Sequence, residues 1–171
     1  MLEILSLMEK IVKQIHELFG LFAPGRKATL DEIEAKVFSL MLEIGRLLVA
    51  GIIRSRGTGF IGKKIQTPSG DTARYHGVRK RSIETLMGTV EIDRAYYYTG
   101  KGGYVPLDES LSLPQEGYSH AAQEAMSLFA IEDSYAESAK KLCHLFPVKV
   151  SGEISLSGEC GRDNIFYAVY R

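Results

Sequence analysis

The chain has 171 residues, of which 45% are apolar and 25% charged, a composition that can form a buried core and argues against intrinsic disorder. No apolar run approaches the ~20 residues of a membrane span, and the N-terminal segment has no basic secretory leader. The two cysteines, Cys143 and Cys160, form no CxxC pair, which is typical of a reducing, cytoplasmic setting and argues against a structural zinc site.

The formal net charge of zero conceals a strong asymmetry along the chain. Residues 1–53 carry a net charge of −1, residues 54–104 carry +6 and residues 105–171 carry −5. A basic middle segment between neutral and acidic flanks favours a polyanionic partner. The alternative is that the acidic third of the chain folds back onto the basic third.

Residues 1–53 are predicted to form a helical hairpin. Thr29 and Glu32 have the spacing of a capping box, which starts the second helix after a break near Pro24 and Gly25. Apolar side chains recur three and four residues apart in both helices, at Ile4, Met8, Ile11, Ile15, Leu18 and Phe22, and then at Leu30, Ile33, Val37, Leu40, Ile44 and Leu47. Each stripe can bury the other within one chain, or the stripes can pair two copies.

Residues 54–72 are rich in glycine and basic residues and have no helical period, so we expect a basic linker there. A short strand around Lys63 and Lys64 is the alternative, because apolar residues flank this pair. From residue 73 the pattern changes to period two and predicts a β-hairpin or small sheet over 73–118. The two strands are expected at 79–86 and 89–98, with the turn at Gly88.

Three consecutive tyrosines close the second predicted strand. We expect Tyr96 and Tyr98 to lie in the core, because they share a face with Val90 and Ile92. Tyr97 is left open between core and surface. The alternative is that the tyrosines stack on bases of single-stranded nucleic acid, as Tyr96, Tyr97, Tyr98 and Tyr104 lie near arginines in the sequence.

The basic residues on or before the first predicted strand are the main candidate binding site. Together with Lys63 and Lys64, they could neutralise several phosphates at once; they are Arg74, Arg79, Lys80 and Arg81. The alternative is a solvated strand edge that its charges protect from aggregation.

The loop Gly100-Lys101-Gly102-Gly103 is predicted to be a plain turn. A phosphate-binding loop would end in Lys-Ser/Thr and open a helix, whereas Tyr104, Val105 and Pro106 follow here. The four histidines lie far apart, and neither an HExxH nor a GxSxG motif occurs. We therefore expect no catalytic centre, no metal site and no cofactor.

Residues 119–160 are predicted to be helical. Ser119 can cap one helix, Ser134 and Glu137 have capping-box spacing for a second, and Pro147 ends it. The stretch LCHLFPVKVSGEIS, with a third element from Ser151, loosely resembles a helix-turn-helix and adds three further DNA-contact candidates, Lys140, Lys141 and Lys149. The predicted fold class is therefore α+β: a helical hairpin, a central hairpin or small sheet, and C-terminal helices.

The order of motifs resembles the N-terminal portion of bacterial insertion-sequence transposases of the ISKra type. The similar segments are RYHGVRKRSIETLMGTVEIDRAYYY, then GYVPLDESLSLPQEGYS, then SLFAIEDSYAESAKKLCHLFPVKVS, which together span about residues 74–151. Family members commonly carry Cys-x-x-Cys after the tyrosines, where this chain has Tyr98-Thr99-Gly100-Lys101. The resemblance ends near Cys160, so residues 161–171 are interpreted as a divergent tail.

This resemblance implies a truncated transposase fragment that binds mobile-element DNA. In the family a metal-dependent nuclease domain of RNase H-like type follows this region, so the fragment is expected to be non-catalytic and cytoplasmic. DNA at the ends of the element is the expected partner, and the N-terminal helices are expected to allow a homodimer. The alternatives are a protein-interaction module without a DNA role and a remnant with no selected activity.

Overall fold

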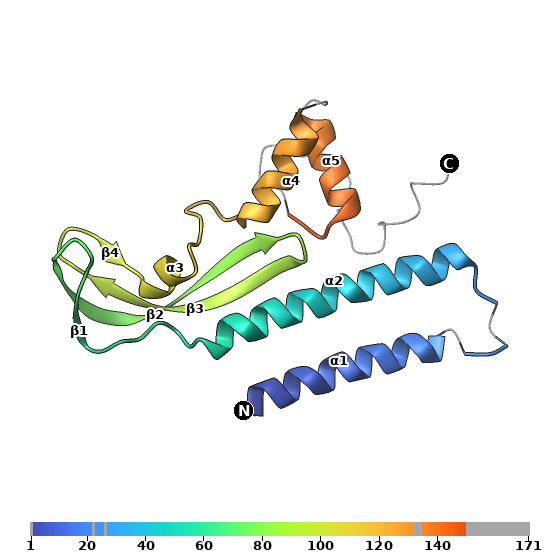
Figure 1. Ribbon diagram of the computed structural model, residues 1–171, viewed down its shortest axis with the longest axis horizontal. Coiled ribbons are helices and arrows are strands. Elements are labelled where there is room, and N and C mark those ends of the chain that lie inside the picture. The colour runs from blue at the N-terminus through green and yellow to red at the C-terminus, as the bar shows by residue number, and fades with distance from the viewer. Residues whose placement is uncertain (1, 22, 26, 132–134, 150–171) are drawn as a thin grey trace.

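The computed structural model describes residues 2–149 except 22, 26 and 132–134, and Figure 1 shows an α+β arrangement in this part of the chain. A helical hairpin comes first, formed by α1 (Leu2–Leu21) and α2 (Leu30–Ser55). Thr29 and Glu32 form the predicted capping box: the Glu32 N–H donates to the Thr29 hydroxyl at 3.3 Å, and the Thr29 N–H donates to the Glu32 carboxylate at 3.0 Å. The helical hairpin is therefore confirmed.

Four antiparallel strands form the sheet in simple sequence order, β1 (Lys64–Gln66), β2 (Thr72–Thr85), β3 (Gly88–Tyr98) and β4 (Gly103–Tyr104). The long β2–β3 hairpin is its centre, and Gly88 after the turn has a φ of +107°, which favours glycine. β1 and β4 widen the hairpin only at its far end, opposite Arg74 and Tyr98. The sheet is thus a narrow ribbon at the turn and a four-stranded surface at the other end (Figure 1).

The two faces of the sheet are covered at opposite ends. Near the hairpin turn, one face packs on α2 and on the short α3 (Pro106–Ser110), through a core of Ala50, Ile83, Val90, Ile92 and Leu107. At the far end the other face is buried, through Ala73, Ala95 and Tyr97 with Ile65 and Tyr104 packed against them. Each face is therefore covered at one end of the sheet and uncovered at the other.

The change of covered face along the sheet determines which of the three tyrosines is buried, and the outcome differs from the expectation. Tyr97 is fully buried, whereas Tyr98 is 49% exposed and Tyr96 is half-buried. Tyr98 does share a face with Val90 and Ile92, but α2 and α3 cover only the part of that face nearer the turn. The placement of Tyr98 in the core is therefore wrong, and Tyr97 is the core residue.

The segment predicted as a basic linker is packed against the sheet. The Tyr97 hydroxyl accepts from the Ile61 N–H and donates to the Gly62 carbonyl, both at 3.0 Å. The ring of Phe60 lies edge-on to Tyr75 at 4.9 Å between centroids, and residues 64–66 form β1. Residues 60–66 therefore form part of the sheet's structure.

Two more helices, α4 (His120–Ala130) and α5 (Tyr135–Leu145), pack on each other near the hairpin turn (Figure 1). Ser119 caps α4 as predicted, by accepting from the Ala122 N–H at 3.2 Å, and α5 ends before Pro147. The second element of the helix-turn-helix-like pair, expected from Ser151, and the tail at 161–171 lie outside the described residues. Within the described ranges no helix is both long and apolar enough to cross a membrane.

Candidate nucleic-acid interface

A bulge in β2 decides which basic side chains share a face of the sheet. The pairing register shifts between Tyr75 and Gly77, so that His76 is an extra residue on this strand. Strict alternation would place Arg74 on the face opposite to Arg79. The bulge reverses the alternation beyond it, and Arg74 joins Arg79 on the same face.

At the four-stranded end, this face carries a row of side chains that runs across the sheet. Arg74 lies directly opposite Lys64 on β1 and opposite Tyr98 on β3, and Tyr98 in turn lies opposite Gly103 on β4. Lys64, Arg74 and Tyr98 are all exposed. Two cations therefore lie beside a half-exposed aromatic ring.

The next two rows of the same face, Gly77–Tyr96 and Arg79–Arg94, hold a second group. The guanidinium of Arg79 lies 3.5 Å from the centre of the Tyr96 ring, and His76 meets that ring edge-on at 6.2 Å between centroids. Gly103 lies beneath this ring: a Cβ there would come within 2.3 Å of Tyr96 Cε2. We call the two groups together the basic-aromatic face; it consists of Lys64, Arg74, His76, Arg79, Tyr96 and Tyr98.

The charges of this face are available to a ligand. In the described part of the chain, no ion pair includes Lys64, Arg74 or Arg79. Their cross-strand partners on this face carry no negative charge: Lys64 lies opposite Arg74, Arg74 also lies opposite Tyr98, and Arg79 lies opposite Arg94. Such a face attracts an anion, since no neighbouring carboxylate in these pairs offsets the positive charge.

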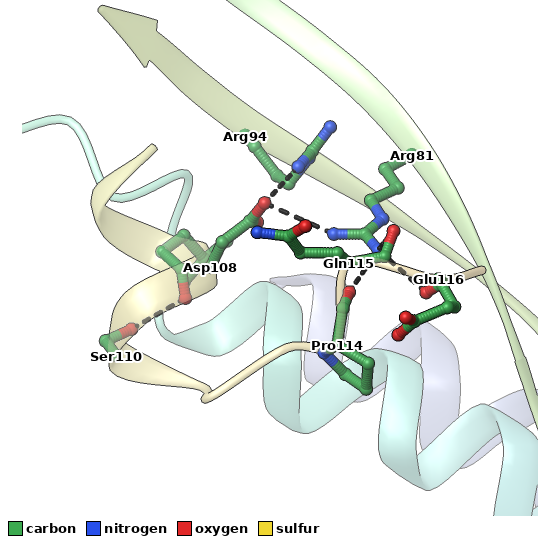
Figure 2. Close-up of polar contacts among 8 residues, drawn as sticks. Arg81, Arg94, Asp108, Ser110, Pro114, Gln115 and Glu116 are labelled. Atoms are coloured by element: carbon green, nitrogen blue, oxygen red, sulfur yellow. Dashed lines mark hydrogen bonds and ion pairs between the residues drawn. The ribbon is translucent and has the colours of Figure 1, made fainter. Parts of the chain in front are cut away.

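Arg81 shares this face but is engaged internally (Figure 2). Its guanidinium donates to Asp108 of α3 at 3.3 Å and to the carbonyls of Pro114, Gln115 and Glu116, and its side chain is 17% exposed. Arg94 donates to the same carboxylate of Asp108. Arg81 therefore points inward and fastens α3 and the following loop to the sheet, so we do not retain it as a phosphate contact.

The other predicted cations lie elsewhere. Lys80 is exposed on the opposite face, across from Asp93, and Lys63 is exposed in the bend directly before β1. Lys140 forms an exposed ion pair with Glu137 at 3.4 Å, and Lys141 is exposed on the same helix, α5. These positions do not join the basic-aromatic face.

Lys149 belongs to the turn end of the hairpin. Its backbone N–H donates to the Glu84 carboxylate at 3.3 Å, and Glu84 pairs with Thr89 close to the turn. Arg74 is ten residues away from Glu84 along β2, which corresponds to roughly 33 Å of strand. The structure thus separates the lysines of the C-terminal helices from the basic-aromatic face.

The loop after the tyrosines is a hydrogen-bonded turn. The Thr99 hydroxyl accepts from the N–H groups of Lys101 and Gly102, and Gly100 has a φ of +87°. Lys101 pairs with Asp71 at 3.1 Å on the surface. Among the described residues no three His, Cys, Asp or Glu side chains come together as possible metal ligands.

The sequence matches one protein family, described as Uncharacterised protein family (UPF0236), over residues 26–159. That match covers well over half of the chain. The chain belongs to this family. The UPF0236 region includes the whole sheet and every residue of the basic-aromatic face. No curated protein and no solved structure matches the chain.

Proposed function

We infer that this UPF0236 chain is the DNA-binding portion of an insertion-sequence transposase, and that it contacts mobile-element DNA through the basic-aromatic face. The observation that carries the proposal is the row in which Lys64 and Arg74 accompany Tyr98, with Arg79 stacked on Tyr96 beside it. The ISKra-type resemblance over about residues 74–151 supports the transposase assignment. The role proposed is binding, without a part in strand cleavage.

Electrostatic contact with phosphates gives these cations a role, since no carboxylate pairs with them in the described part of the chain. Each neutralised phosphate of a duplex releases condensed counterions, so that the logarithm of affinity falls with the logarithm of salt by about 0.9 per contact. Lys64, Arg74 and Arg79 can supply three such contacts. This term is largely independent of base sequence, because phosphates carry no sequence information.

Fluorescence anisotropy with a labelled duplex across a series of salt concentrations tests this proposal. The triple variant Lys64→Ala/Arg74→Ala/Arg79→Ala is expected to flatten the salt slope by about 2.7 and to weaken binding to every duplex. Lys80→Ala is the matched control, because it removes one exposed cation from the same sheet on the opposite face. Equal slopes for the triple variant and the parent chain would remove the DNA contact from this face.

A second function is favoured by the helical hairpin: we propose that it pairs two copies of the chain. Among the four members of the predicted α1 stripe whose side chains the structure describes, Ile11 and Leu18 are half-buried, while Met8 and Ile15 are exposed. All of the exposed large apolar side chains that the structure describes on α2, and all of those on α1 except Leu21, fall within an arc of about 60° on their helix. They are Met8, Val12, Ile15 and Phe19 on α1, and Leu30, Val37, Met41, Leu48 and Ile52 on α2.

The two arcs lie on one side of the hairpin. On each helix the arc lies about a quarter turn away from the side that contacts the other helix. Because the two helices are antiparallel, both arcs then face the same side of the hairpin. Nine side chains that each expose on the order of 100 Å² provide roughly 900 Å², close to the ~800 Å² per partner of a stable interface. Exposed apolar patches of this size mark interaction sites.

The pairing is tested by light scattering on the intact chain. Val12→Glu/Met41→Glu is expected to convert a dimer to a monomer, since both positions lie in the apolar arcs and are 63% and 65% exposed. Lys10→Glu, on the far side of α1, is the control and should leave the mass unchanged. A monomeric parent chain at all concentrations would exclude the proposed pairing.

A further inference from the structure

The basic-aromatic face has the features of a site for unpaired nucleotides. Tyr98 is 49% exposed, so the ring is available to a ligand. In a duplex the flat faces of the bases are hidden against their neighbours, whereas a single strand exposes them for stacking on aromatic rings. An exposed ring beside two cations therefore suits a strand whose phosphates and bases are both free.

The width of the sheet also favours a single strand over a duplex as the ligand. The row Lys64–Arg74–Tyr98–Gly103 crosses four strands, and three strand spacings of about 4.8 Å give roughly 14 Å between the outer backbones. The major groove of duplex DNA is about 12 Å wide and admits a two-stranded ribbon. At this end the sheet is too wide to enter the groove, but it can lie flat against an open strand.

Tyr98 is also held in place before any ligand arrives. Its hydroxyl donates to the Gly100 carbonyl at 3.2 Å, and the Thr99 hydroxyl fixes the same turn through two backbone N–H groups. A ring anchored at its far end loses little conformational freedom when a base stacks on it. The neighbouring cations, Lys64 and Arg74, come from two different strands and are positioned by the ladder of the sheet.

We propose that the four-stranded end of this sheet binds single-stranded DNA, with one base stacked on Tyr98 and the adjoining phosphates held by Lys64 and Arg74. This inference rests on the DNA-binding function proposed above and specifies its ligand. It predicts a preference for unpaired or frayed DNA over a closed duplex of the same length. Arg79 and Tyr96 extend the same surface along the strand direction.

The experiment measures the affinity of the intact chain for labelled oligothymidylate, for an abasic oligonucleotide of equal length and for a closed duplex. The parent chain should bind oligothymidylate more tightly than either of the other probes. Tyr98→Leu should weaken oligothymidylate binding by about 5- to 100-fold and leave duplex binding nearly unchanged. Tyr98→Phe is the matched control, because it keeps the ring and removes only the hydroxyl contact to Gly100.

The outcomes separate this inference from the proposed function. Equal affinity of the parent chain for the abasic and the thymidine strands would overturn base stacking without any recourse to a variant. Duplex binding with a salt slope that depends on Lys64 and Arg74, together with no loss for Tyr98→Leu, would keep the DNA-binding function and reject the single-strand site. No binding to any of the three probes would reject both proposals.

Discussion

The guanidinium of Arg79 on β2 stacks on the ring of Tyr96 on β3, with its carbon 3.5 Å from the ring centre. The two residues lie on neighbouring rows of the same face of the sheet, because Arg79 is paired with Arg94 and Tyr96 with Gly77. The contact orients a side chain that would otherwise move freely in solvent. It also directs the positive charge of Arg79 toward the four-stranded end of the sheet.

This contact should have a measurable coupling energy. A double-mutant cycle of Arg79→Ala and Tyr96→Leu is expected to give about 0.5–1 kcal/mol in the free energy of unfolding, the range for exposed cation–π pairs. Urea denaturation of the parent chain, both single variants and the double variant supplies the four values. A coupling energy of zero would show that Arg79 does not rest on the ring in solution.

Gly103 should tolerate no side chain, because Tyr96 occupies the space that a Cβ would need. The Cβ of Gly103→Ala would lie 2.3 Å from Tyr96 Cε2 and 2.5 Å from its hydroxyl oxygen. The ring must then move, and we expect a loss of about 1–3 kcal/mol in the free energy of unfolding, which chemical denaturation measures.

Gly102→Ala provides a neighbouring control for this experiment. A Cβ at Gly102 would meet no atom within 4 Å, and this glycine does not have a positive φ. Its substitution should change the free energy of unfolding by less than about 0.5 kcal/mol. Similar losses for the two variants would mean that Tyr96 does not pack over Gly103.

The features that were predictable from the sequence are those whose partners are close in the chain. Thr29 and Glu32 are three residues apart, and Ser119 bonds an N–H three residues later, so both helix starts follow from local spacing. The period-two pattern likewise predicted the β2–β3 hairpin, because alternation is a property of a single strand.

The features that were missed depend on contacts between distant segments. Arg81 meets Asp108 across 27 positions of the chain, and nothing in the local pattern of β2 distinguishes it from Arg79. The bulge at His76 reverses the alternation and so determines which cations act together, and the period-two pattern alone does not mark its position. The exposure of Tyr98 depends on how far along the sheet α2 and α3 extend.

Of the carboxylates in the described ion pairs, that of Asp108 is expected to contribute most to the free energy of unfolding. Two arginines, 17% and 13% exposed, share its carboxylate, so Asp108→Ala leaves two largely buried positive charges without their counterion (Figure 2). We expect a loss of about 2–3 kcal/mol in the free energy of unfolding, somewhat below the cost for fully buried pairs because some solvent reaches the cluster. Chemical denaturation measures this loss.

Asp71→Ala is the control for Asp108→Ala. Among the described residues Asp71 forms a single ion pair, with Lys101, and the lysine side chain is 80% exposed, so that the contact lies on the surface. Exposed pairs contribute about 0–1 kcal/mol, so this variant should remain close to the parent chain. Equal losses for both variants would contradict the structural role of the Arg81–Asp108–Arg94 cluster.

The Tyr104 hydroxyl is expected to lose its proton at a higher pH than an ordinary tyrosine. Its hydroxyl donates to the Glu109 carboxylate at 2.5 Å, and this hydrogen bond, with a smaller contribution from burial, raises the pKa of Tyr104 to about 12. A raised pKa in the folded state means that the contact stabilises the fold below the ordinary tyrosine pKa of about 10. This contribution should disappear as the pH rises from about 10 to about 12.

Difference titration of tyrosinate absorbance between the parent chain and Tyr104→Phe isolates this group from the other tyrosines. Glu109→Gln is expected to bring the Tyr104 pKa back toward its ordinary value of about 10, because the amide carries no charge to oppose ionisation of the phenol. The same substitution should weaken the dependence of unfolding on pH between about 10 and about 12. A Tyr104 pKa that is the same in the parent chain and in the Glu109→Gln variant would show that the carboxylate does not hold the phenol proton, and that the contact between β4 and α3 is weaker than the structure indicates.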